Sequence, residues 1–349
     1  MTVQNAFSMH SSVVVVAGKG GVGKSTLSAT VARMAARNGV SVLLVELEER
    51  NSCRGFLGDH VLTADEVELS AGEVDERGSR SAPIRARTVT PEDALAEHLV
   101  DHGFGWAARR LAKSGLLDAA ATAIPGVRDF LVLGKIVQLE RAHAADLIVV
   151  DGPAAGHATT FLTSAQGLLD SSRAGPLHAK AADVVGFLSD PTRCQVVLVT
   201  LAEETPVNET VETARTLQDR AGAHLGPVIV NCVYPQLDRL DADPKAAAAA
   251  AGVTLRAGEA DALREAAGFR RRRQEMQVEQ TTRLAEALSL HQVWLPYLFA
   301  AEIGPAEIDL LVDAMEAGLV PLCEPVRRAD WRAPTTMAGS ESPDLPRPA

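Results

Sequence analysis

The sequence is poor in aromatic residues, in clustered cysteines and in positive charge. Aromatic side chains make up only 4% of the 349 residues, so the core must be filled mainly by aliphatic side chains. A net charge of −11 argues against a general nucleic-acid-binding surface, which needs a basic footprint, and no nucleic-acid partner is expected. The cysteines form no CxxC pair, which favours reduced core thiols over a disulfide framework or a zinc knuckle. They are Cys53, Cys194, Cys232 and Cys323.

Long apolar runs are also missing. No uninterrupted apolar segment approaches the length of a membrane span. Residues 1–12 have neither the charged start nor the apolar stretch of a secretory signal, so a cytoplasmic location is expected. Residues 326–349 are rich in Pro, Ser and Arg with almost no apolar content, and this composition predicts a disordered tail.

A glycine-rich segment, residues 18–26, directly follows the apolar run 13–17. Its spacing fits the strand–GxxxxGK(S/T)–helix pattern of a phosphate-binding loop. Glycines let the backbone turn tightly and aim N–H groups inward, and the following helix adds its positive end, so a triphosphate fits there. Lys24 is predicted to reach the β- and γ-phosphates, and the Ser25 hydroxyl to bind the Mg²⁺ that accompanies ATP or ADP. The predicted loop residues are Gly18, Gly20, Gly21, Val22, Gly23, Lys24, Ser25 and Thr26.

Further short apolar segments predict a sheet built from βαβ units. A second strand is expected over 40–46 and another over 146–151, which ends on Asp151 as in a Walker B strand. Asp151 would act on the magnesium ion through water, although a strand-terminal aspartate also commonly caps a helix. More strands are expected over 196–200 and 227–231. The polar stretch 63–87 predicts a surface excursion with an edge hairpin.

These elements predict an α/β P-loop NTPase with a doubly wound, mostly parallel sheet. The ATPase domain is expected to cover residues 1–325. Apolar residues at helical spacing predict an inserted helical subdomain over about 91–141. Further helices are expected over about 160–190 and 238–290, where charges four positions beyond the arginines of 270–273 predict an internally paired, solvated helix face.

The loop carries a second lysine, Lys19, and its Lys-Gly-Gly-x-Gly-Lys-Ser/Thr form resembles a known family. It is similar to the deviant Walker A loop of MinD, ParA, nitrogenase iron protein, the arsenite-pump ATPase ArsA and the tail-anchored-protein targeting ATPases. Residues 151–157 resemble the switch II segment of the ArsA and tail-anchored-targeting branch. The resemblance covers about residues 12–320 and implies a bacterial homologue of that branch.

The resemblance assigns roles to particular residues. It implies that Lys19 reaches the nucleotide of a facing subunit, in a homodimer or in a heterodimer with a paralogous ATPase, although exposed loop lysines are common. It also implies that Asn231 borders the adenine, where a plain strand-end turn is the alternative. Pro296 is implied to lie on the same adenine side. Switch II would consist of Gly152, Pro153, Gly156 and His157.

The departures from the branch bear on activity. Glu48 stands where the branch has the aspartate that positions the attacking water, and the Pro and His of that segment are missing. A displacement of about 1 Å at such a group can cost about a hundredfold in rate, so ATP hydrolysis is expected to be slow or partner-dependent. An acidic surface turn explains Glu48 equally well. The alternative function is a weakly hydrolysing or non-hydrolysing structural subunit of a hetero-oligomer.

The client of such a switch is not defined by the sequence. The scattered cysteines do not support arsenite pumping, and whether a metalloid is bound stays open. Six methionines leave no clear trace of the Met-rich groove that would hold a transmembrane segment. A client or a membrane-protein partner therefore stays open as well.

Overall fold

The structure is a computed structural model that describes residues 11–47, 53, 55–58, 60–72, 81–101 and 126–319. Glu48, the middle of the predicted helical subdomain (102–125) and the predicted tail (326–349) lie outside these residues. Of residues 101 and 154–156, only the backbone is described.

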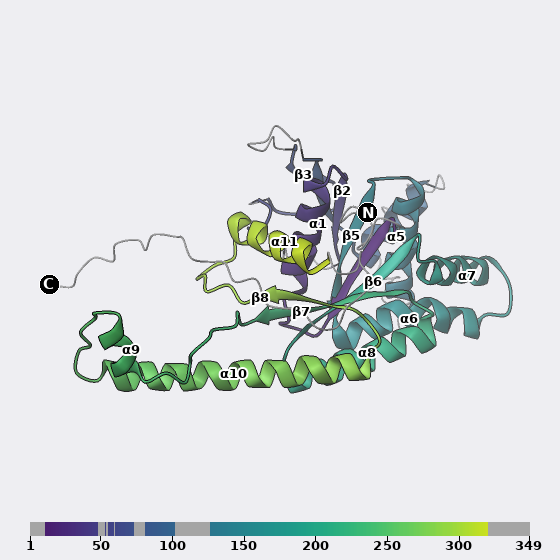
Figure 1. The fold of residues 1–349 in the computed structure, drawn as a ribbon. Helices are drawn as coiled ribbons and strands as arrows, with labels where there is room; N and C mark the ends of the chain where they lie inside the picture. Colours follow the sequence, from purple (N-terminus) through teal and green to yellow (C-terminus); the bar gives the residue numbers. More distant parts are fainter. Residues whose placement is uncertain are drawn as a thin grey trace. The chain divides into compact units, whose positions relative to one another are not determined.

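The described residues form an α/β fold around one sheet with the strand order β3-β4-β2-β5-β1-β6-β7-β8 (Figure 1). Neighbouring strands are parallel except for β3, which runs antiparallel to β4 at the edge. The predicted mostly parallel sheet is therefore confirmed. The strands are β1 (Val13–Gly18), β2 (Val42–Glu46), β3 (Val67–Ser70), β4 (Ile84–Thr88), β5 (Leu147–Ala154), β6 (Cys194–Leu201), β7 (Leu225–Val233) and β8 (Gln292–Pro296).

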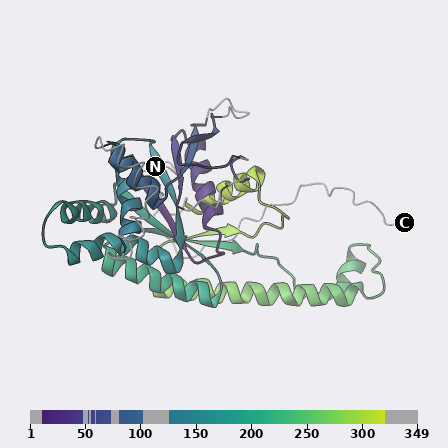
Figure 2. The same cartoon turned by 180° about the vertical axis from the view of Figure 1, so that it is seen from behind.

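Helices cover both faces of this sheet, as the doubly wound arrangement requires (Figures 1 and 2). Helices α5, α6, α7 and α8 pack on one face, and α1 and α11 pack on the other. The helices are α1 (Lys24–Arg37), α2 (Pro91–Asp101), α5 (Val127–Arg141), α6 (Ala155–Ser171), α7 (Pro176–Ser189), α8 (Glu204–Ala221), α9 (Pro244–Ala250), α10 (Glu259–Ala287) and α11 (Pro305–Leu319). Among these helices, none has the length and apolar character needed to cross a lipid bilayer.

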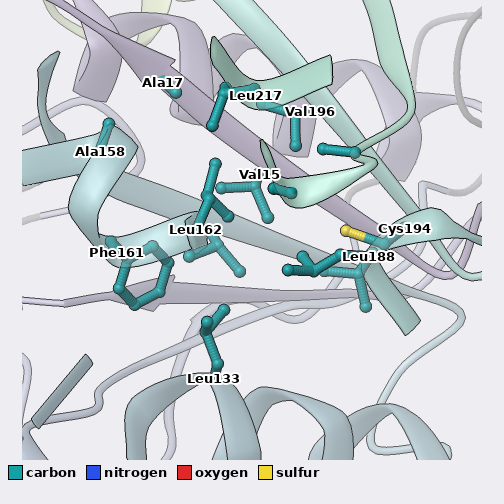
Figure 3. Close-up of a cluster of buried hydrophobic side chains, with 14 of the residues drawn as sticks. Val15, Ala17, Leu133, Ala158, Phe161, Leu162, Leu188, Cys194, Val196 and Leu217 are labelled. Atoms are coloured by element: carbon teal, nitrogen blue, oxygen red, sulfur yellow. The ribbon is translucent and has the colours of Figure 1, made fainter. Parts of the chain in front are cut away.

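The core is aliphatic on both faces of the sheet, as the shortage of aromatics predicts. Every residue of β1 and β2 is buried, because each strand lies between two others and carries helices above and below. Alternate valines of β1 enter different clusters: Val15 belongs to the cluster that includes residues of α6 and α7, whereas Val16 belongs to the cluster that includes residues of α1. Figure 3 shows part of the first cluster, in which Phe161 and Leu162 of α6 lie near Leu133 of α5.

Strand β4 corrects the prediction that residues 63–87 are a surface excursion. The antiparallel β3–β4 pair is the predicted hairpin, but β4 lies inside the sheet beside β2 and is almost fully buried. One of its two arginines, Arg87, is only 6% exposed and pairs with Glu97 of α2. Glu97 also pairs with the buried Lys135 of α5. The Glu97 carboxylate therefore neutralises two buried cations and ties α2 and α5 to the sheet. The charges of the strand alone predicted exposure, because the residue that neutralises Arg87 lies on α2.

The chain divides into two compact units. The larger unit contains the sheet, with residues up to 233 and from 277 to 325. In the smaller unit, residues 234–276 hold α9 and the first part of α10. There the Arg270 guanidinium stacks over the Tyr234 ring at 4.4 Å and donates a hydrogen bond to the Pro235 carbonyl. Arg271 lies 3.7 Å from Glu275, which confirms the internal pairing predicted for the arginine run.

Candidate nucleotide-binding site

The glycine-rich segment forms a tight turn between β1 and α1. Gly21 (φ 84°) and Gly23 (φ 94°) both have left-handed backbone conformations, which glycine adopts without the strain other residues would meet. Helix α1 begins at Lys24, and no side chain caps its first turn. The N–H groups of the first helical turn and the positive end of the helix dipole therefore face the loop, which is a favourable place for an anion.

Close backbone contacts fix the positions of the glycines that border the loop. A Cβ atom on Gly18 would lie 2.4 Å from the Val199 carbonyl oxygen, and one on Gly152 would lie 2.3 Å from that of Val16. These contacts hold β6 and β5 against the end of β1, where the β1–β5 register shifts. Glycine is required at both positions because any side chain would push the strands apart.

A buried polar cluster lies at the start of α1, on the β5 side of the loop. Ser25 donates a 2.6 Å hydrogen bond to Asp151 Oδ2, and Ser28, one turn further along α1, donates to Oδ1 at 3.1 Å. Burial raises the pKa of the Asp151 carboxyl to about 6, although the two serine hydrogen bonds act in the opposite direction. The predicted pair of Ser25 and Asp151 is therefore brought into contact.

Glu46 is a second buried carboxylate that the sequence reasoning did not single out. It ends β2 directly beside Asp151 in the sheet register and is 2% exposed. Its Oε1 accepts a 2.7 Å hydrogen bond from the Cys53 backbone N–H, which joins the two ends of the segment that contains Glu48. Burial raises the pKa of the Cys53 thiol well above its ordinary value, and the neighbouring Asp151 and Glu46 carboxylates add to this rise. The position of Glu46 at the end of a predicted strand, like that of Asp151, was the sequence signal that could have identified it.

The two loop lysines occupy different places. The Lys24 ammonium donates to the Lys19 carbonyl oxygen at 3.2 Å and so lies across the loop. The Lys19 ammonium instead forms a 2.7 Å ion pair with Glu209 of α8, and both side chains are more than a third exposed. Glu209 lies 190 positions from Lys19, and no sequence signal indicates their contact.

Asn231 lies against the loop from the β7 side. Its amide donates a 3.0 Å hydrogen bond to the Val22 carbonyl, and the same nitrogen would lie 2.3 Å from a Cβ atom on Gly23. Its side-chain oxygen accepts from the Cys232 N–H at 2.9 Å. Asn231 therefore braces the loop, a contact that the sequence did not indicate. Pro296 ends β8 at the same edge of the sheet, opposite Val233 in the register.

The predicted switch II residues follow Asp151 at the end of β5. Gly152 and Pro153 belong to the strand, and Gly156 and His157 lie in the first turn of α6. His157 is exposed and lies close enough to Asp129 of α5 to lower the pKa of that carboxyl, which burial raises. His157, six residues after Asp151, therefore lies near α5.

The donor set fits a magnesium ion that arrives with a nucleotide. A serine hydroxyl and an aspartate carboxylate are oxygen ligands of the kind that Mg²⁺ prefers, and Mg²⁺ commonly takes its remaining ligands from phosphates and water. Within the described ranges, no group of three or more His, Cys, Asp or Glu side chains could hold a metal ion without such help. The cluster thus suits an ion bound jointly by the protein and a phosphate chain.

Fold and site together define a nucleotide-binding protein of the P-loop class. Residues 11–170 match the family model described as anion-transporting ATPase. The matched part of the chain, which is similar to this ArsA-type family, carries the loop, Asp151 and the predicted switch II residues.

Curated proteins that are similar in sequence to this chain are named as ATPases. ATPase BagA of Mycobacterium tuberculosis is 35% identical over 228 residues, which are 63% of this chain and 65% of that protein. A putative arsenical pump-driving ATPase of Halobacterium salinarum is 26% identical over 236 residues, 63% of this chain and 35% of the relative. ATPase GET3 of Pyricularia oryzae is 28% identical over 154 residues, 43% and 42% of the two chains. The chain thus spans less than two thirds of the length of each of these relatives.

Proposed function

We propose that this chain is a Mg-ATP-dependent switch that binds and slowly hydrolyses ATP and couples the nucleotide state to the opening and closing of a dimer. The observation that carries the proposal is the Ser25–Asp151 contact at the uncapped start of α1. A hydroxyl and a carboxylate lie there beside a turn whose backbone N–H groups suit phosphates. The names of the relatives, which are ATPases, support the same activity.

The residues take separate roles in this proposal. Lys24 and the loop N–H groups hold the phosphates, and Ser25 and Asp151 hold the magnesium ion, Asp151 through water. When bound, magnesium would neutralise charge on the phosphates and orient them. Glu48 would position the attacking water. Asn231 keeps the loop in shape through Val22, and its remaining N–H is the group proposed to meet the base.

Dimer formation requires a change at Lys19. Its ammonium is neutralised by Glu209 of the same chain, so it must leave this partner before it reaches a nucleotide across a subunit boundary. An exposed ion pair of this kind is worth about 0.2–1 kcal/mol, whereas a charge-assisted hydrogen bond to a phosphate is worth about 1.5–3 kcal/mol. The exchange is therefore favourable once a nucleotide is presented.

A second candidate function is a nucleotide-binding structural subunit in a hetero-oligomer with a paralogous ATPase. Glu48 in place of an aspartate favours it, because the longer side chain displaces the carboxylate that would position water. In that case the chain would bind ATP with little turnover of its own, and the paralogue would supply the hydrolysing site. A client or a membrane-protein partner fits either function.

ATP turnover and ATP binding by the purified chain, measured in the same samples, test the proposal. Lys24→Ala removes the central phosphate contact, and Lys245→Ala, an exposed lysine on α9, is the matched control. Turnover by the wild-type chain that Lys24→Ala abolishes and Lys245→Ala preserves would support the self-sufficient ATPase.

Other outcomes separate the two candidates. Tight ATP binding with turnover only after a paralogous subunit is added would favour the structural-subunit function. Neither binding nor turnover, with or without such a subunit, would overturn both. Sedimentation in ATP and in ADP then reports whether the nucleotide changes the oligomeric state.

A further inference from the structure

Four residues around the start of α1 form a closed ring of contacts. Glu46 Oε1 accepts a 2.7 Å hydrogen bond from the Cys53 N–H, and the Cys53 thiol donates a weak 3.7 Å hydrogen bond to the Ser25 carbonyl. The Ser25 hydroxyl donates to Asp151, and Asp151 is the register partner of Glu46 on the neighbouring strand. This contact ring joins β2 and β5 to the first turn of α1.

Cys53 is the member of the contact ring that connects Glu46 to Ser25. Its side chain is buried, and burial raises the pKa of the thiol well above its ordinary value, so at neutral pH the sulfur keeps the proton that it donates. Ser25 is therefore held at two atoms, its hydroxyl by Asp151 and its carbonyl by Cys53. A shift of Cys53 would displace the residue that is proposed to bind the magnesium ion.

The charge of Glu46 is unusual for its position in the core. Every residue of β2 is buried, so an aliphatic side chain would suit this position as it suits the rest of the strand. Glu46 also lies beside Asp151, and its negative charge adds to the burial that raises the pKa of Asp151 to about 6. Neighbouring carboxylates repel each other, and a cation close to both reverses this effect. A charged residue at position 46 therefore suits the proposed cation site better than it suits the core.

We propose that Glu46 is a positioning residue of the magnesium site, which fixes Ser25 through Cys53 and strengthens the attraction for the cation by its negative charge. The inference rests on the proposed Mg-ATP-binding function and adds a residue to it. Glu46 does not bind the ion itself but acts on Ser25 and Asp151, and groups that orient the ligands of a metal affect its affinity strongly. Because Glu46 and Cys53 enclose the segment that contains Glu48, their hydrogen bond also joins both ends of that segment to the cation site.

Calorimetric titration of the full chain with ATP, once with Mg²⁺ and once with EDTA, tests the role of Glu46. The ratio of the two affinities reports on the cation site, because ATP without magnesium still contacts the loop. Glu46→Gln keeps the acceptor oxygen but loses the charge, and should lower this ratio about three- to tenfold. Glu46→Leu loses both, and should lower it about 10- to 100-fold. ATP affinity in EDTA should stay unchanged or rise, because a negative charge near the phosphates is removed.

Labelling of Cys53 with a thiol reagent measures the positioning without nucleotide or turnover. Mass spectrometry of the peptide that contains Cys53 follows the reaction. Labelling of the wild-type chain should be slow, because a buried thiol with a raised pKa is unreactive. Glu46→Leu should be labelled about 10- to 100-fold faster, since the hydrogen bond that holds Cys53 is lost. Glu46→Gln should be labelled only about two- to fivefold faster, because its amide oxygen still accepts that hydrogen bond.

Two further variants serve as controls. Glu68→Gln makes the same charge change at an exposed glutamate of β3 and should alter neither the affinity ratio nor the labelling. Cys53→Ala keeps the N–H donor and the Glu46 charge but loses the contact with the Ser25 carbonyl, and should lower the affinity ratio about two- to threefold. If Glu46→Leu does not fold, Glu46→Gln and Cys53→Ala test the same two contributions separately.

The outcomes that contradict this role of Glu46 are distinct from those that contradict ATP binding. The positioning role would be overturned if the affinity ratio stayed at the wild-type value in the Glu46 variants, or if ATP affinity fell equally with Mg²⁺ and with EDTA. Unchanged labelling of Cys53 in Glu46→Leu would overturn the connection through Cys53. In each case a wild-type chain that binds Mg-ATP would leave the proposed function standing. A wild-type chain that binds ATP neither with nor without magnesium would overturn the proposed function itself.

Discussion

The two lysines of the phosphate-binding loop lie five positions apart and meet very different surroundings. Lys24 lies across the loop and reaches the Lys19 carbonyl, beside the buried cluster of Ser25 and Asp151. Lys19 points to the mouth of the loop and pairs with Glu209 of α8, where both side chains contact solvent. One lysine lies in the phosphate pocket, by which we mean the loop together with Ser25 and Asp151, and the other has a partner that it can leave.

This difference follows from where the surrounding groups come from. The pocket around Lys24 is built by neighbouring strand ends, which the sheet holds in fixed register. Glu209 stands on a helix surface, so its pairing with Lys19 depends on two long side chains that solvent can separate. Substitutions in the pocket should therefore strongly reduce ATP binding and turnover even in an isolated chain. Substitutions at the mouth should have smaller effects, which appear only when a second subunit is present.

Replacement of Lys24 by alanine should have the largest effect. Lys24→Ala is expected to lower ATP turnover about a hundredfold or more, because it removes a charged donor from the centre of the phosphate site. Steady-state hydrolysis and ATP titration measure this loss, with Lys245→Ala as control. If Lys24→Ala retained wild-type ATP affinity, Lys24 would have no role in phosphate binding that Lys19 lacks, and the comparison of the two lysines would fail.

Asp151 tests the cation side of the same pocket. Asp151→Asn keeps the shape but removes the charge, and is expected to weaken the apparent affinity for Mg²⁺ about 10- to 100-fold in the presence of ATP. Magnesium titrations at fixed ATP measure this change. Ser28→Ala, which removes only one of the hydrogen bonds to Asp151, should give a smaller loss. Equal Mg²⁺ dependence of wild type and Asp151→Asn would rule out the assigned role.

The pH dependence of stability gives an independent readout of this carboxyl. Without nucleotide and with magnesium chelated, its folded-state pKa of about 6 exceeds the value of about 3.9 expected in the unfolded chain. The protonated carboxyl thus adds stability that is fully present below about pH 4 and is lost as the pH rises through 6. Denaturant unfolding should show that wild type loses about 2–3 kcal/mol relative to Asp151→Asn across this range.

The pocket was largely predictable from the sequence, because its signals are local. The valine run of β1, the glycine spacing and the carboxylate after the β5 apolar run each lie within a few residues of the feature they encode. The proximity of Asp151 and Ser25 could be predicted because the carboxyl ends of parallel strands lie at the same edge of the sheet. The same rule applied to β2 would also have found Glu46.

What the sequence did not reveal depends on contacts between distant segments. Strand β4 reads as polar because of its arginines, and only the pairing of Arg87 with Glu97 makes its burial possible. The brace from Asn231 to Val22 spans 209 positions, and the Lys19–Glu209 pair spans 190. No local pattern encodes such contacts, since they exist only once the sheet order is set.

The mouth lysine should behave differently from Lys24 when it is removed. Lys19→Ala is expected to leave ATP affinity of the isolated chain within about twofold, because its ammonium is already held by Glu209. ATP-dependent association should weaken about tenfold, the loss of one charge-assisted hydrogen bond across subunits. Sedimentation equilibrium measures the association. A loss of ATP affinity as large as that of Lys24→Ala would place both lysines in one pocket and end the comparison.

Removal of the intrachain partner should have the smallest effect and the opposite sign. Glu209→Gln releases Lys19 from an exposed ion pair worth about 0.2–1 kcal/mol, so ATP-dependent association should strengthen about two- to fivefold. Glu212→Gln, the same charge change one turn further along α8, is the control and should leave association unchanged. In a Lys19→Ala background Glu209→Gln should also have no effect, because the lysine it competes for is gone. If Glu209→Gln strengthened association equally with and without Lys19, the cause would be the net charge of the chain. Glu209 would then not compete with a second subunit for the Lys19 ammonium.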